Sequence, residues 1–524
     1  MTLRSALSRP ARWYSLAAGG LPVLAFPGAG QAWLAWVALV PGMLLMQRAP
    51  GGREAAVRGW WFGAGFILVG MYWLVPSIGP ALLPLAVVFG VLQAAFGFAV
   101  WRLLHGRVGP GRALAALVVV PAVWVCCEFA RSWHALGGPW ALLGASQWEH
   151  PAVLALASVG GVWLVSAVVV ACNTAVVLLC SARLRVLPVV AVALCLAVGP
   201  VLFGLLPPPA PGGTATVALV QPGQTPDEVS RLAASLRITR GLAGQPVDLV
   251  VWGESSTTAD LDRDTAVLGE LRALSAGTGA DLLVGEDARK ADGRISKDAV
   301  LVTPEGVQAR YRKIRLVPFG EYIPFRSTLG WIAGVSRAAG ENRAPGAGFR
   351  LLPATDRGGA PLPVGVLICF ESAFPDMSRQ AARDGAPLIV YQSATSTFQD
   401  TWAPAQHASL GALRAAETGR PVVQAALTGE SVAYDRQGRR LAGTGTDGTG
   451  ALVVRLPLAE PSALTWYDRL GDWVPLGSVA VAVAAGAVAV ARRGRGGGAA
   501  SADGPSAEAG AGAEAERPTA RGRG

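Results

Sequence analysis

Long apolar blocks, each close to the length of a membrane-spanning helix, constrain the fold of this chain more than any other feature. A helix that crosses a bilayer needs about 20 mostly apolar residues. Of the 524 residues, 52% are hydrophobic and only 15% are charged, which is too apolar for one soluble globule. We therefore predict a polytopic α-helical membrane domain with eight spans. The expected spans are residues 13–28, 31–47, 59–76, 81–101, 113–130, 152–180, 186–206 and 473–491.

Composition divides the chain into four parts. Residues 1–211 hold the first seven spans, and residues 212–472 have the pattern of a soluble α/β domain. The eighth span, 473–491, leads into a Gly/Ala-rich tail of mixed charge, 492–524, which we expect to be disordered. Because further spans follow the first one directly, we interpret the first as an uncleaved anchor rather than a signal peptide. The block 152–180 is long enough to be tilted or to include an interfacial turn.

The arginines of the loops predict the orientation of the spans, because Lys and Arg are enriched on the cytoplasmic side. They gather before span one, in every second loop and after span eight, whereas the alternate short loops hold only Arg131. We therefore expect both termini in the cytoplasm and 212–472 outside it. The cytoplasmic set is Arg4, Arg9, Arg12, Arg48, Arg53, Arg58, Arg102, Arg107, Arg112, Arg183, Arg185, Arg492, Arg493 and Arg495.

The net charge of +10 fits this topology and does not indicate a nucleic-acid partner. A basic protein that binds nucleic acid gathers its positive charge on one face of a domain. Here residues 212–472 carry nearly equal numbers of acidic and basic residues, so the excess lies in the cytoplasmic loops and the tail.

The soluble block alternates strand and helix patterns, which indicates a mixed-sheet α/β layer fold. Pro304 and Glu305 form the turn of a hairpin. The expected helices are 226–243, 261–277, 376–384 and 403–419. The expected strands are 214–220, 247–252, 281–285, 298–303, 306–312, 362–368, 387–392, 421–427, 431–435 and 450–455.

Three strand ends carry residues with catalytic potential. Glu254 follows a buried strand in VVWGES, Lys313 ends a hairpin strand in YRKIRLVPFGEYIP with Glu321 eight residues on, and Cys369 with Glu371 follows a strand in ICFES. Taken alone, each is typical of a packed or solvated rim residue, and a free cysteine usually packs in the core. Of the six cysteines, however, only Cys369 lies outside the spans, and a lone extracytoplasmic thiol is a candidate reactive group.

Taken together, these residues make a nucleophile constellation. A thiol is mostly protonated at neutral pH and needs a base and a nearby cation to form the thiolate. Glu254 can serve as the base, and Lys313 can stabilise the thiolate and then a tetrahedral oxyanion. The chain has only three lysines; we place Lys290 and Lys297 in a polar loop, whereas Lys313 lies against an apolar segment. A compact ammonium approaches an oxyanion in a way that a guanidinium does not.

The order Glu, Lys, Cys after successive strands resembles the nitrilase (carbon–nitrogen hydrolase) superfamily. The segments WGES, YRKIRLVPFGEYIPFR, CFESAFPD and PAQHASLGALRAAETGRPVVQAALTGES resemble the apolipoprotein N-acyltransferase family of bacterial membranes. That family inserts a nitrilase-like domain between its seventh and eighth membrane helices. The resemblance covers nearly the whole chain up to about residue 491 and implies an extracytoplasmic αββα sandwich on a bacterial cytoplasmic membrane.

The resemblance also implies roles for individual residues. Glu254 matches the family's general base, Lys313 its oxyanion-stabilising lysine and Cys369 its acyl-accepting thiol. Glu321 and Glu371 match further acidic residues around the thiol, either with a direct role or as structural carboxylates that orient Lys313 or a backbone turn.

The chain departs from the family pattern at three places. Phe370 stands where a tyrosine is frequent, and the segments SATSTFQ (393–399) and QAAL (424–427) replace the usual ones, which bears on acceptor or donor preference. The segment 325–345 suits either a lipid-contacting lid or a buried insertion helix. Its apolar residues are Leu329, Trp331 and Ile332.

The resemblance implies ping-pong acyl transfer from a phospholipid, at its sn-1 ester, through a Cys369 thioester to the α-amine of a diacylglyceryl-cysteine apolipoprotein. The partners are then the bilayer, the phospholipid and the apolipoprotein. Two alternatives stay open: a membrane-anchored amidase or nitrilase using the same three residues, and a transporter or scaffold with a degenerate outer domain. No metal or other cofactor is implied, because the four histidines lack ligand spacing.

Overall fold

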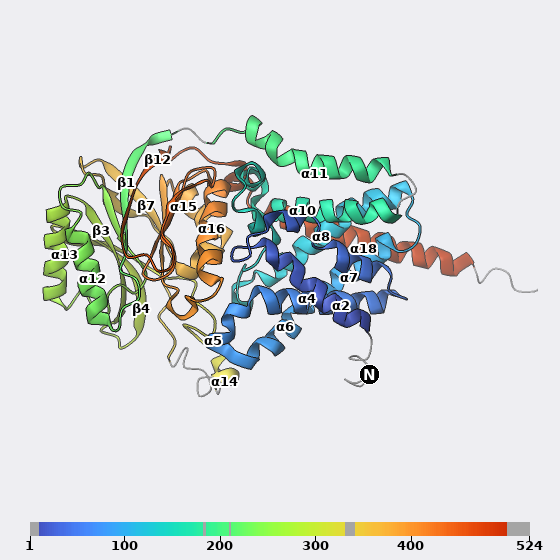
Figure 1. The fold of residues 1–524 in the computed structure, drawn as a ribbon, viewed down its shortest axis with the longest axis horizontal. Coiled ribbons are helices and arrows are strands. Elements are labelled where there is room, and N and C mark those ends of the chain that lie inside the picture. The colour runs from blue at the N-terminus through green and yellow to red at the C-terminus, as the bar shows by residue number, and fades with distance from the viewer. Residues whose placement is uncertain (1–9, 182–184, 209–210, 331–340, 500–524) are drawn as a thin grey trace, which may run out of the picture.

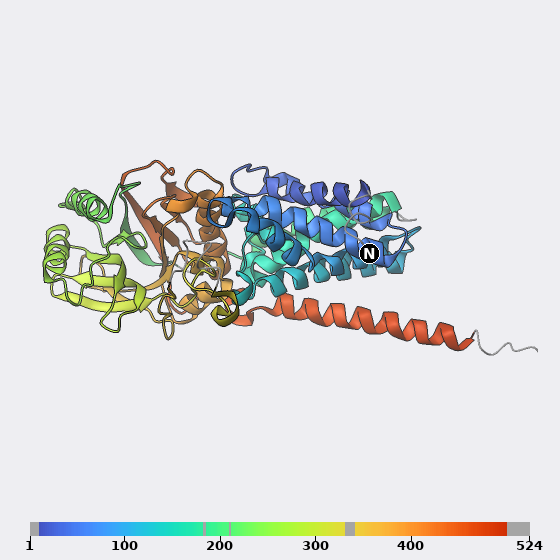
Figure 2. The same cartoon turned by 90° about the horizontal axis from the view of Figure 1, so that it is seen from below.

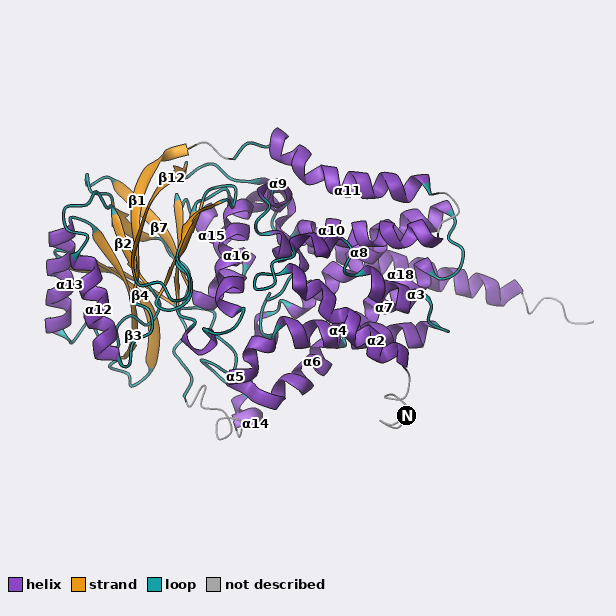
Figure 3. Ribbon diagram, viewed as in Figure 1, coloured by secondary structure: helices purple, strands orange, loops and turns teal. Residues whose placement is uncertain are grey.

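The computed structural model describes residues 10–181, 185–208, 211–330 and 341–499. It consists of a helical half and an α/β half that lie end to end along the longest axis (Figure 1). All labelled strands lie in the α/β half (Figure 3). The last helix, α18 (Trp473–Ala499), leaves the α/β half and runs alongside the helical half to its far end (Figure 2).

The helical half is built from apolar helices broken by glycine and proline. Its principal core includes Phe62, Phe96 and Trp124, whose rings meet edge to face. The helices before α18 are α2 (Pro10–Gly20), α3 (Val40–Gln47), α4 (Gly52–Gly70), α5 (Val75–Ile78), α6 (Leu82–Gly90), α7 (Gln93–Leu104), α8 (Pro110–Arg131), α9 (Pro151–Leu154), α10 (Ala157–Ser181) and α11 (Val186–Leu205).

Among the described residues, five helical segments are long and apolar enough to cross a membrane. They are Tyr72–Gly90, Pro110–Arg131, Ala157–Cys180, Val186–Leu205 and Trp473–Ala491. The other expected spans are shorter or shifted. Helix α2 gives way to a 3₁₀ turn that contains Pro22, the apolar stretch Ala32–Gln47 is short, and α4 begins at Gly52 amid charged residues.

Two expected spans contain breaks. The block 81–101 is divided into α6 and α7, and the block 152–180 contains α9 followed by α10. Gly160 and Gly161 depart from helical geometry inside α10, with φ of 67° at Gly161, where the Tyr467 ring leaves no room for a Cβ. The block is therefore broken by a turn, one of the two possibilities expected for it.

The α/β half contains two six-stranded sheets. Their strand orders are β12-β1-β2-β3-β4-β5 and β11-β10-β9-β8-β7-β6. The strands are β1 (Pro211–Gln221), β2 (Leu249–Trp252), β3 (Asp281–Arg289), β4 (Ile295–Thr303), β5 (Gly306–Arg312), β6 (Leu352–Thr355), β7 (Pro361–Ile368), β8 (Leu388–Ser393), β9 (Val422–Ala426), β10 (Val432–Tyr434), β11 (Arg440–Gly443) and β12 (Gly450–Ala459).

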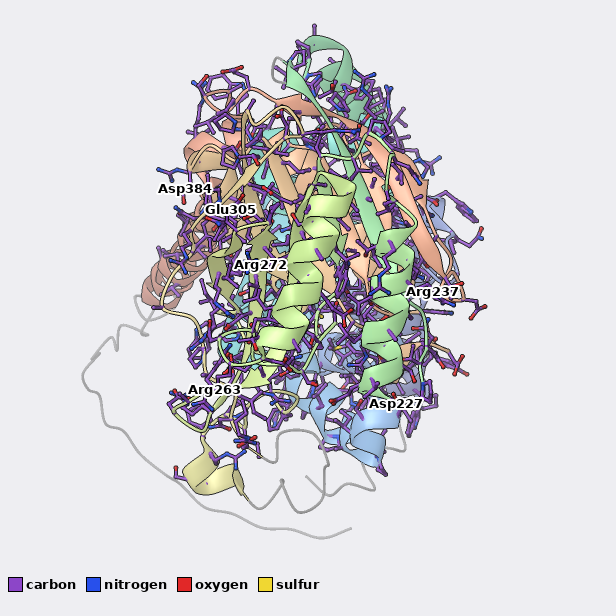
Figure 4. The ribbon with its side chains drawn as sticks, turned by 90° about the vertical axis from the view of Figure 1, so that its left-hand side faces the viewer. Asp227, Arg237, Arg263, Arg272, Glu305 and Asp384 are labelled. Atoms are coloured by element: carbon purple, nitrogen blue, oxygen red, sulfur yellow. The ribbon has the colours of Figure 1, made fainter. Side chains whose placement is uncertain are left out.

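Helices cover the outer faces of these sheets. Helices α12 (Glu228–Arg240) and α13 (Thr265–Thr278) lie on the face far from the helical half, where they carry charged side chains such as Arg237 and Arg272 (Figure 4). Helices α15 (Pro375–Arg383) and α16 (Ala403–Thr418) lie between the sheets and the helical half (Figure 1). The expected helices and strands of this half are confirmed, and the mixed α/β fold with them. The short strands β6 and β11 and the helices α14 (Arg326–Leu329) and α17 (Trp466–Leu470) were not expected.

The two sheets approach each other closely at Gly253. A Cβ on Gly253 would lie 2.2 Å from the backbone nitrogen of Leu427 and 2.8 Å from the carbonyl oxygen of Ser393. Gln392 of β8 donates to the carbonyl of Trp252 at 2.9 Å, across the two sheets. The ends of β2 and β8 are therefore held together, which brings residues after β2 close to the second sheet.

Helix α16 joins the two halves. The indole of Trp140 donates to Gln406 at 3.0 Å, and Glu417 accepts the backbone N–H of Val162, at the α10 kink, at 2.8 Å. Because these bonds are buried, they fix the near end of the helical half against α16.

Candidate active site

Glu254, Lys313 and Cys369 come from the ends of three strands in two different sheets. Glu254 follows β2 and Lys313 follows β5 in the first sheet, whereas Cys369 follows β7 in the second. The packing of the two sheets brings the three side chains together, with the Cys369 thiol in hydrogen-bonding reach of the Glu254 carboxylate. The proximity expected from the sequence is thus present, and the roles of the three residues are taken up below as a proposal.

The Lys313 ammonium lies between two carboxylates. Its Nζ donates to Glu254 Oε1 at 2.9 Å and to Glu321 Oε1 at 2.8 Å, and the lysine side chain is only 1% exposed. The second oxygen of Glu321 accepts the backbone N–H of Val317 at 2.8 Å, so Glu321 ties the ammonium to the loop after β5. A buried cation needs such partners, because an unpaired one would lose several kcal/mol of hydration.

Protonation states follow from this arrangement. Burial raises the pKa of the Cys369 thiol to about 12, and the neighbouring Glu254 carboxylate adds to the rise. Burial also acts to raise the pKa of Glu254, but the charges of Lys297 and Lys313 outweigh it and lower that pKa to about 2. Burial acts to lower the pKa of Lys313, but Glu254 and Glu321 hold it well above its usual value. At neutral pH the resting site therefore holds a thiol, a carboxylate and an ammonium.

The turn that presents Cys369 has a strained backbone, which several hydrogen bonds hold in place. Cys369 has φ of 50°, in the left-handed region, which costs a non-glycine residue about 1–2 kcal/mol. Glu371 holds this turn, because its oxygens accept the backbone N–H groups of Ile368 at 2.8 Å and Ile314 at 2.7 Å. The Tyr311 hydroxyl donates to the same carboxylate at 2.9 Å. Glu371 thus joins the Cys369 turn to the end of β5, which favours its positioning role over direct chemistry.

Lys297 is a second ammonium at the site, and the prediction that it lies in a polar loop is wrong. It lies on β4 with its side chain 12% exposed, and its Nζ is 3.4 Å from Glu254 Oε1 and 3.9 Å from Glu321 Oε1. It also donates to Ser255 Oγ at 2.7 Å and to Asp287 Oδ2 at 3.0 Å. Two ammonium groups therefore face the Glu254 carboxylate: that of Lys313, which follows β5, and that of Lys297, which lies on β4.

His407 of α16 lies beneath the Cys369 turn and was not expected there. Its ring nitrogens lie 3.4 Å from Ser372 Oγ and 3.3 Å from Ser393 Oγ, and the ring also bonds the backbone of Cys369. Trp140 stacks on it with ring centroids 6.0 Å apart. Burial lowers the pKa of His407 to about 4, so it is neutral at pH 7 and supports the turn without adding charge.

A backbone donor lies beside the Cys369 sulfur. Cys369 is half-buried, and the backbone N–H of Ala394, after β8, donates to its sulfur. This N–H comes from the segment 393–399 that departs from the family pattern. A backbone N–H beside the sulfur can also stabilise negative charge that develops on an atom attached to it.

Comparisons with known proteins identify the family of this chain. Residues 18–175 match the model of the apolipoprotein N-acyltransferase N-terminal domain, and residues 216–464 match that of the carbon–nitrogen hydrolase domain. The chain is 30% identical to an apolipoprotein N-acyltransferase of Geobacter metallireducens over 90% of this chain and 95% of that protein. The chain belongs to the apolipoprotein N-acyltransferase family.

Other relatives carry the same name. An apolipoprotein N-acyltransferase of Pseudomonas aeruginosa is 30% identical over 82% of this chain and 86% of that protein. Among solved structures, Nit3 of Saccharomyces cerevisiae, a member of the nitrilase superfamily, matches 47% of this chain and 91% of its own, with 20% identity and a TM-score of 0.36.

The remaining residues predicted for this N-acyltransferase site lie elsewhere. Phe370 points to an aromatic cluster, with its ring centroid 5.1 Å from that of Phe374. Leu329 ends the short helix α14, whereas Trp331 and Ile332 lie outside the described residues. The choice between a lid and a buried insertion for this segment stays a prediction.

Replacing Lys297 with Met tests its influence on Glu254. Loss of an opposite charge at this distance raises a carboxylate pKa by about 1–3 units. Glu254 would then become protonated, and lose its ability to accept a proton, at a higher pH than in the native protein. We expect the rate of Cys369 acylation by phospholipid to fall up to about ten-fold more between pH 7 and pH 4 than in the native protein, as followed by intact mass spectrometry.

Lys290→Met is the matched control. Lys290 follows β3 in the same hairpin, is equally 12% exposed and pairs with Asp260 at 2.9 Å and with Glu286 instead of Glu254. Its pH profile should stay parallel to that of the native protein. Parallel profiles for both variants would contradict an effect of Lys297 on Glu254.

Proposed function

We propose that the protein transfers a fatty acyl chain from a membrane phospholipid, through a thioester on Cys369, to the N-terminal α-amine of an S-diacylglyceryl-cysteine apolipoprotein. The observation that carries the proposal is a half-buried cysteine in reach of an ionised carboxylate that is itself bonded to a buried ammonium. Family membership supports the acyl transfer, and the apolar helices beside the α/β half suit substrates whose chains stay in a bilayer.

In the first half-reaction Cys369 Sγ attacks an ester carbonyl of the phospholipid. The family resemblance implies the ester at sn-1. The thiol proton passes to Glu254 as the C–S bond forms, because neither a free thiolate nor a protonated Glu254 is stable alone in the resting site. The carbonyl oxygen gains negative charge and is stabilised by the Lys313 ammonium and the Ala394 N–H. Collapse breaks the C–O bond, and the departing lysophospholipid oxygen takes the proton from Glu254.

In the second half-reaction the uncharged α-amine of the apolipoprotein attacks the thioester carbonyl. Glu254 accepts a proton from the attacking amine, and the same two donors stabilise the new oxyanion. The C–S bond then breaks, and the proton on Glu254 returns to the sulfur. The amide product leaves the enzyme in its starting protonation state, so one base serves both steps.

We further propose that the chain crosses the membrane eight times, with both termini in the cytoplasm and residues 212–472 outside. The five long apolar helices, the shorter ones at the other expected positions and the loop arginines support this topology. Breaks such as the one inside α10 are tolerated where the backbone is buried in protein.

A donor-and-acceptor assay tests the acyl transfer. Full-length protein in detergent is mixed with phospholipid labelled in its sn-1 chain, and a diacylglyceryl-cysteine peptide is added afterwards. We expect one labelled chain on Cys369 before the peptide and its transfer to the peptide amine afterwards. Cys369→Ala should abolish both steps, and Glu254→Gln should slow them by at least about 100-fold, within the usual range for a general base.

Cys180→Ala is the matched control, because Cys180 is exposed and lies in a helix far along the chain from the site. It should acylate the peptide at the native rate. Release of free fatty acid with no acylated peptide would contradict the proposed transferase and favour a hydrolase. Unchanged transfer by Cys369→Ala would contradict a thioester altogether.

Two added cysteines test the topology. Asp292→Cys, in the exposed β3–β4 turn, should react with a membrane-impermeant maleimide in intact spheroplasts, whereas Ser501→Cys, in the tail, should react only after lysis. The native protein gives the background of its own cysteines. Labelling of Ser501→Cys before lysis, or protection of Asp292→Cys, would contradict the proposed orientation.

A further inference from the structure

A cavity of about 260 Å³ lies at the junction of the two halves, and it shares no residue with the site around Cys369. The end of α11, the start of the α9–α10 segment, α17 and the turn between β10 and β11 form its walls. The helices α9 and α11 that flank it can be followed in Figure 3. The lining residues used below are Ala155, Phe203, Leu206, Arg436, Trp466 and Arg469.

Close backbone packing sets the shape of this cavity. Helix α11 approaches α9 at Gly199, where a Cβ would lie 2.8 Å from the carbonyl oxygen of Ala152. The β10–β11 turn is seated at Gly438, where φ is 80° and a Cβ would lie 2.5 Å from the carbonyl oxygen of Ala412. Helix α11 thus packs directly on α9 and the turn packs directly on α16, so close packing fixes two walls of the cavity.

One wall of the cavity is apolar and another carries arginines. Ala155, Phe203 and Leu206 give it an apolar wall, and the guanidinium groups of Arg436 and Arg469 line it from separate elements. Arginine stays charged in proteins and bonds phosphate oxygens with a planar fork of donors. A ligand that satisfies both walls must carry an anionic group beside a hydrocarbon part.

The charges around the cavity favour an anion. Burial lowers the pKa of Arg436, although Asp435 acts to raise it, so the Arg436 charge is partly desolvated. The Asp435 carboxylate is occupied within its own turn, where it accepts the backbone N–H groups of Gln437 and Arg439, both at 2.9 Å. The Arg439 guanidinium adds a third positive charge nearby, 5.4 Å from the ring centroid of Phe203.

The rim of the cavity is suited to a bilayer surface. Leu205 at the end of α11 is 70% exposed, and Trp466 and Leu470 of α17 are each 54% exposed. Tryptophan favours the level of lipid headgroups, and exposed leucines on an apolar helix suit contact with acyl chains. A ligand arriving from the lipid would thus reach the arginines with its chains beside α11.

We propose that this cavity binds an anionic membrane phospholipid, with its phosphate between Arg436 and Arg469 and an acyl chain along α11. This lipid is held at the junction of the two halves and contributes no atom to acyl transfer. A lipid bound only to the folded protein stabilises it in proportion to its occupancy. The site therefore couples the stability of the junction to the anionic lipid content of the membrane.

Native mass spectrometry of the full-length chain tests the site. Delipidated protein carrying Cys369→Ala, which cannot consume the lipid as a donor, is titrated with phosphatidylglycerol whose acyl chain bears a photoreactive group. We expect crosslinks on peptides of α11 or α17. Arg436→Gln with Arg469→Gln should weaken retention of the lipid at these peptides by at least about 10-fold, the effect of losing a hydrogen bond to a charged group.

The controls test separately whether the arginine charges, the lipid chains or loss of folding account for a change in binding. Arg436→Lys with Arg469→Lys should restore part of the binding, and Arg357→Gln with Arg455→Gln, at exposed arginines of the α/β half, should leave it unchanged. A thermal melt in detergent checks that each variant is folded. The proposal is overturned if diacylglycerol with the same chains is retained equally, if millimolar inorganic phosphate displaces the lipid, or if the crosslinks fall elsewhere. Because transfer is disabled in this experiment, failure of the site leaves the proposed acyl transfer untouched.

Discussion

The buried Lys313 ammonium, held between Glu254 and Glu321, is the interaction on which the rest of the site depends. Two carboxylates and two ammonium groups, with Lys297 as the second, balance their charges in a region where an unpaired ion would be costly. These charges keep Glu254 ionised, and burial together with the Glu254 charge keeps the neighbouring Cys369 thiol protonated. In our account the sulfur becomes nucleophilic only when a bound ester carbonyl accepts its electrons. Without a bound ester, Cys369 remains a protonated thiol that reacts slowly with electrophiles.

The same constraint explains the attachment of the α/β half to apolar helices. A site that waits for a bound ester needs that ester delivered and held, and the proposed substrates remain in the bilayer. Residues from the helical half reach the supports of the site, because Trp140 stacks on His407 and bonds Gln406. The loop before α9 therefore contacts the Cys369 turn through the His407 ring. A shift of the helices would displace this ring and alter the position of the sulfur.

The sequence predicted the elements that bury long apolar runs and failed where polar residues continue an element. Strands β2 and β7 are apolar up to their last residues, so Glu254 and Cys369 could be placed at strand ends. Strand β5 follows a hairpin turn, which allowed Lys313 to be placed at its end. The hairpin of β3 and β4 extends past its apolar runs, to Arg289 and from Ile295, and these polar ends looked like a loop. Lys297 was missed for this reason. His407 was missed because its partners, Trp140 and Cys369, are far away along the chain. Pro22 lies in a 3₁₀ turn that breaks the first apolar block, which hydropathy alone could not show, whereas the break at the glycines of α10 was one of two possibilities expected for its block.

The most direct test of a thiol kept neutral by its surroundings is the pH dependence of its alkylation in the substrate-free protein. Iodoacetamide is added to the full-length chain between about pH 6 and pH 10, and modification of the Cys369 peptide is followed by mass spectrometry. With a pKa of about 12, the rate should rise throughout this range without reaching a plateau, and it should stay below that of an ordinary thiol, whose pKa is about 8.5. A plateau below about pH 8 would mean that a thiolate exists before the substrate arrives, which would contradict the account.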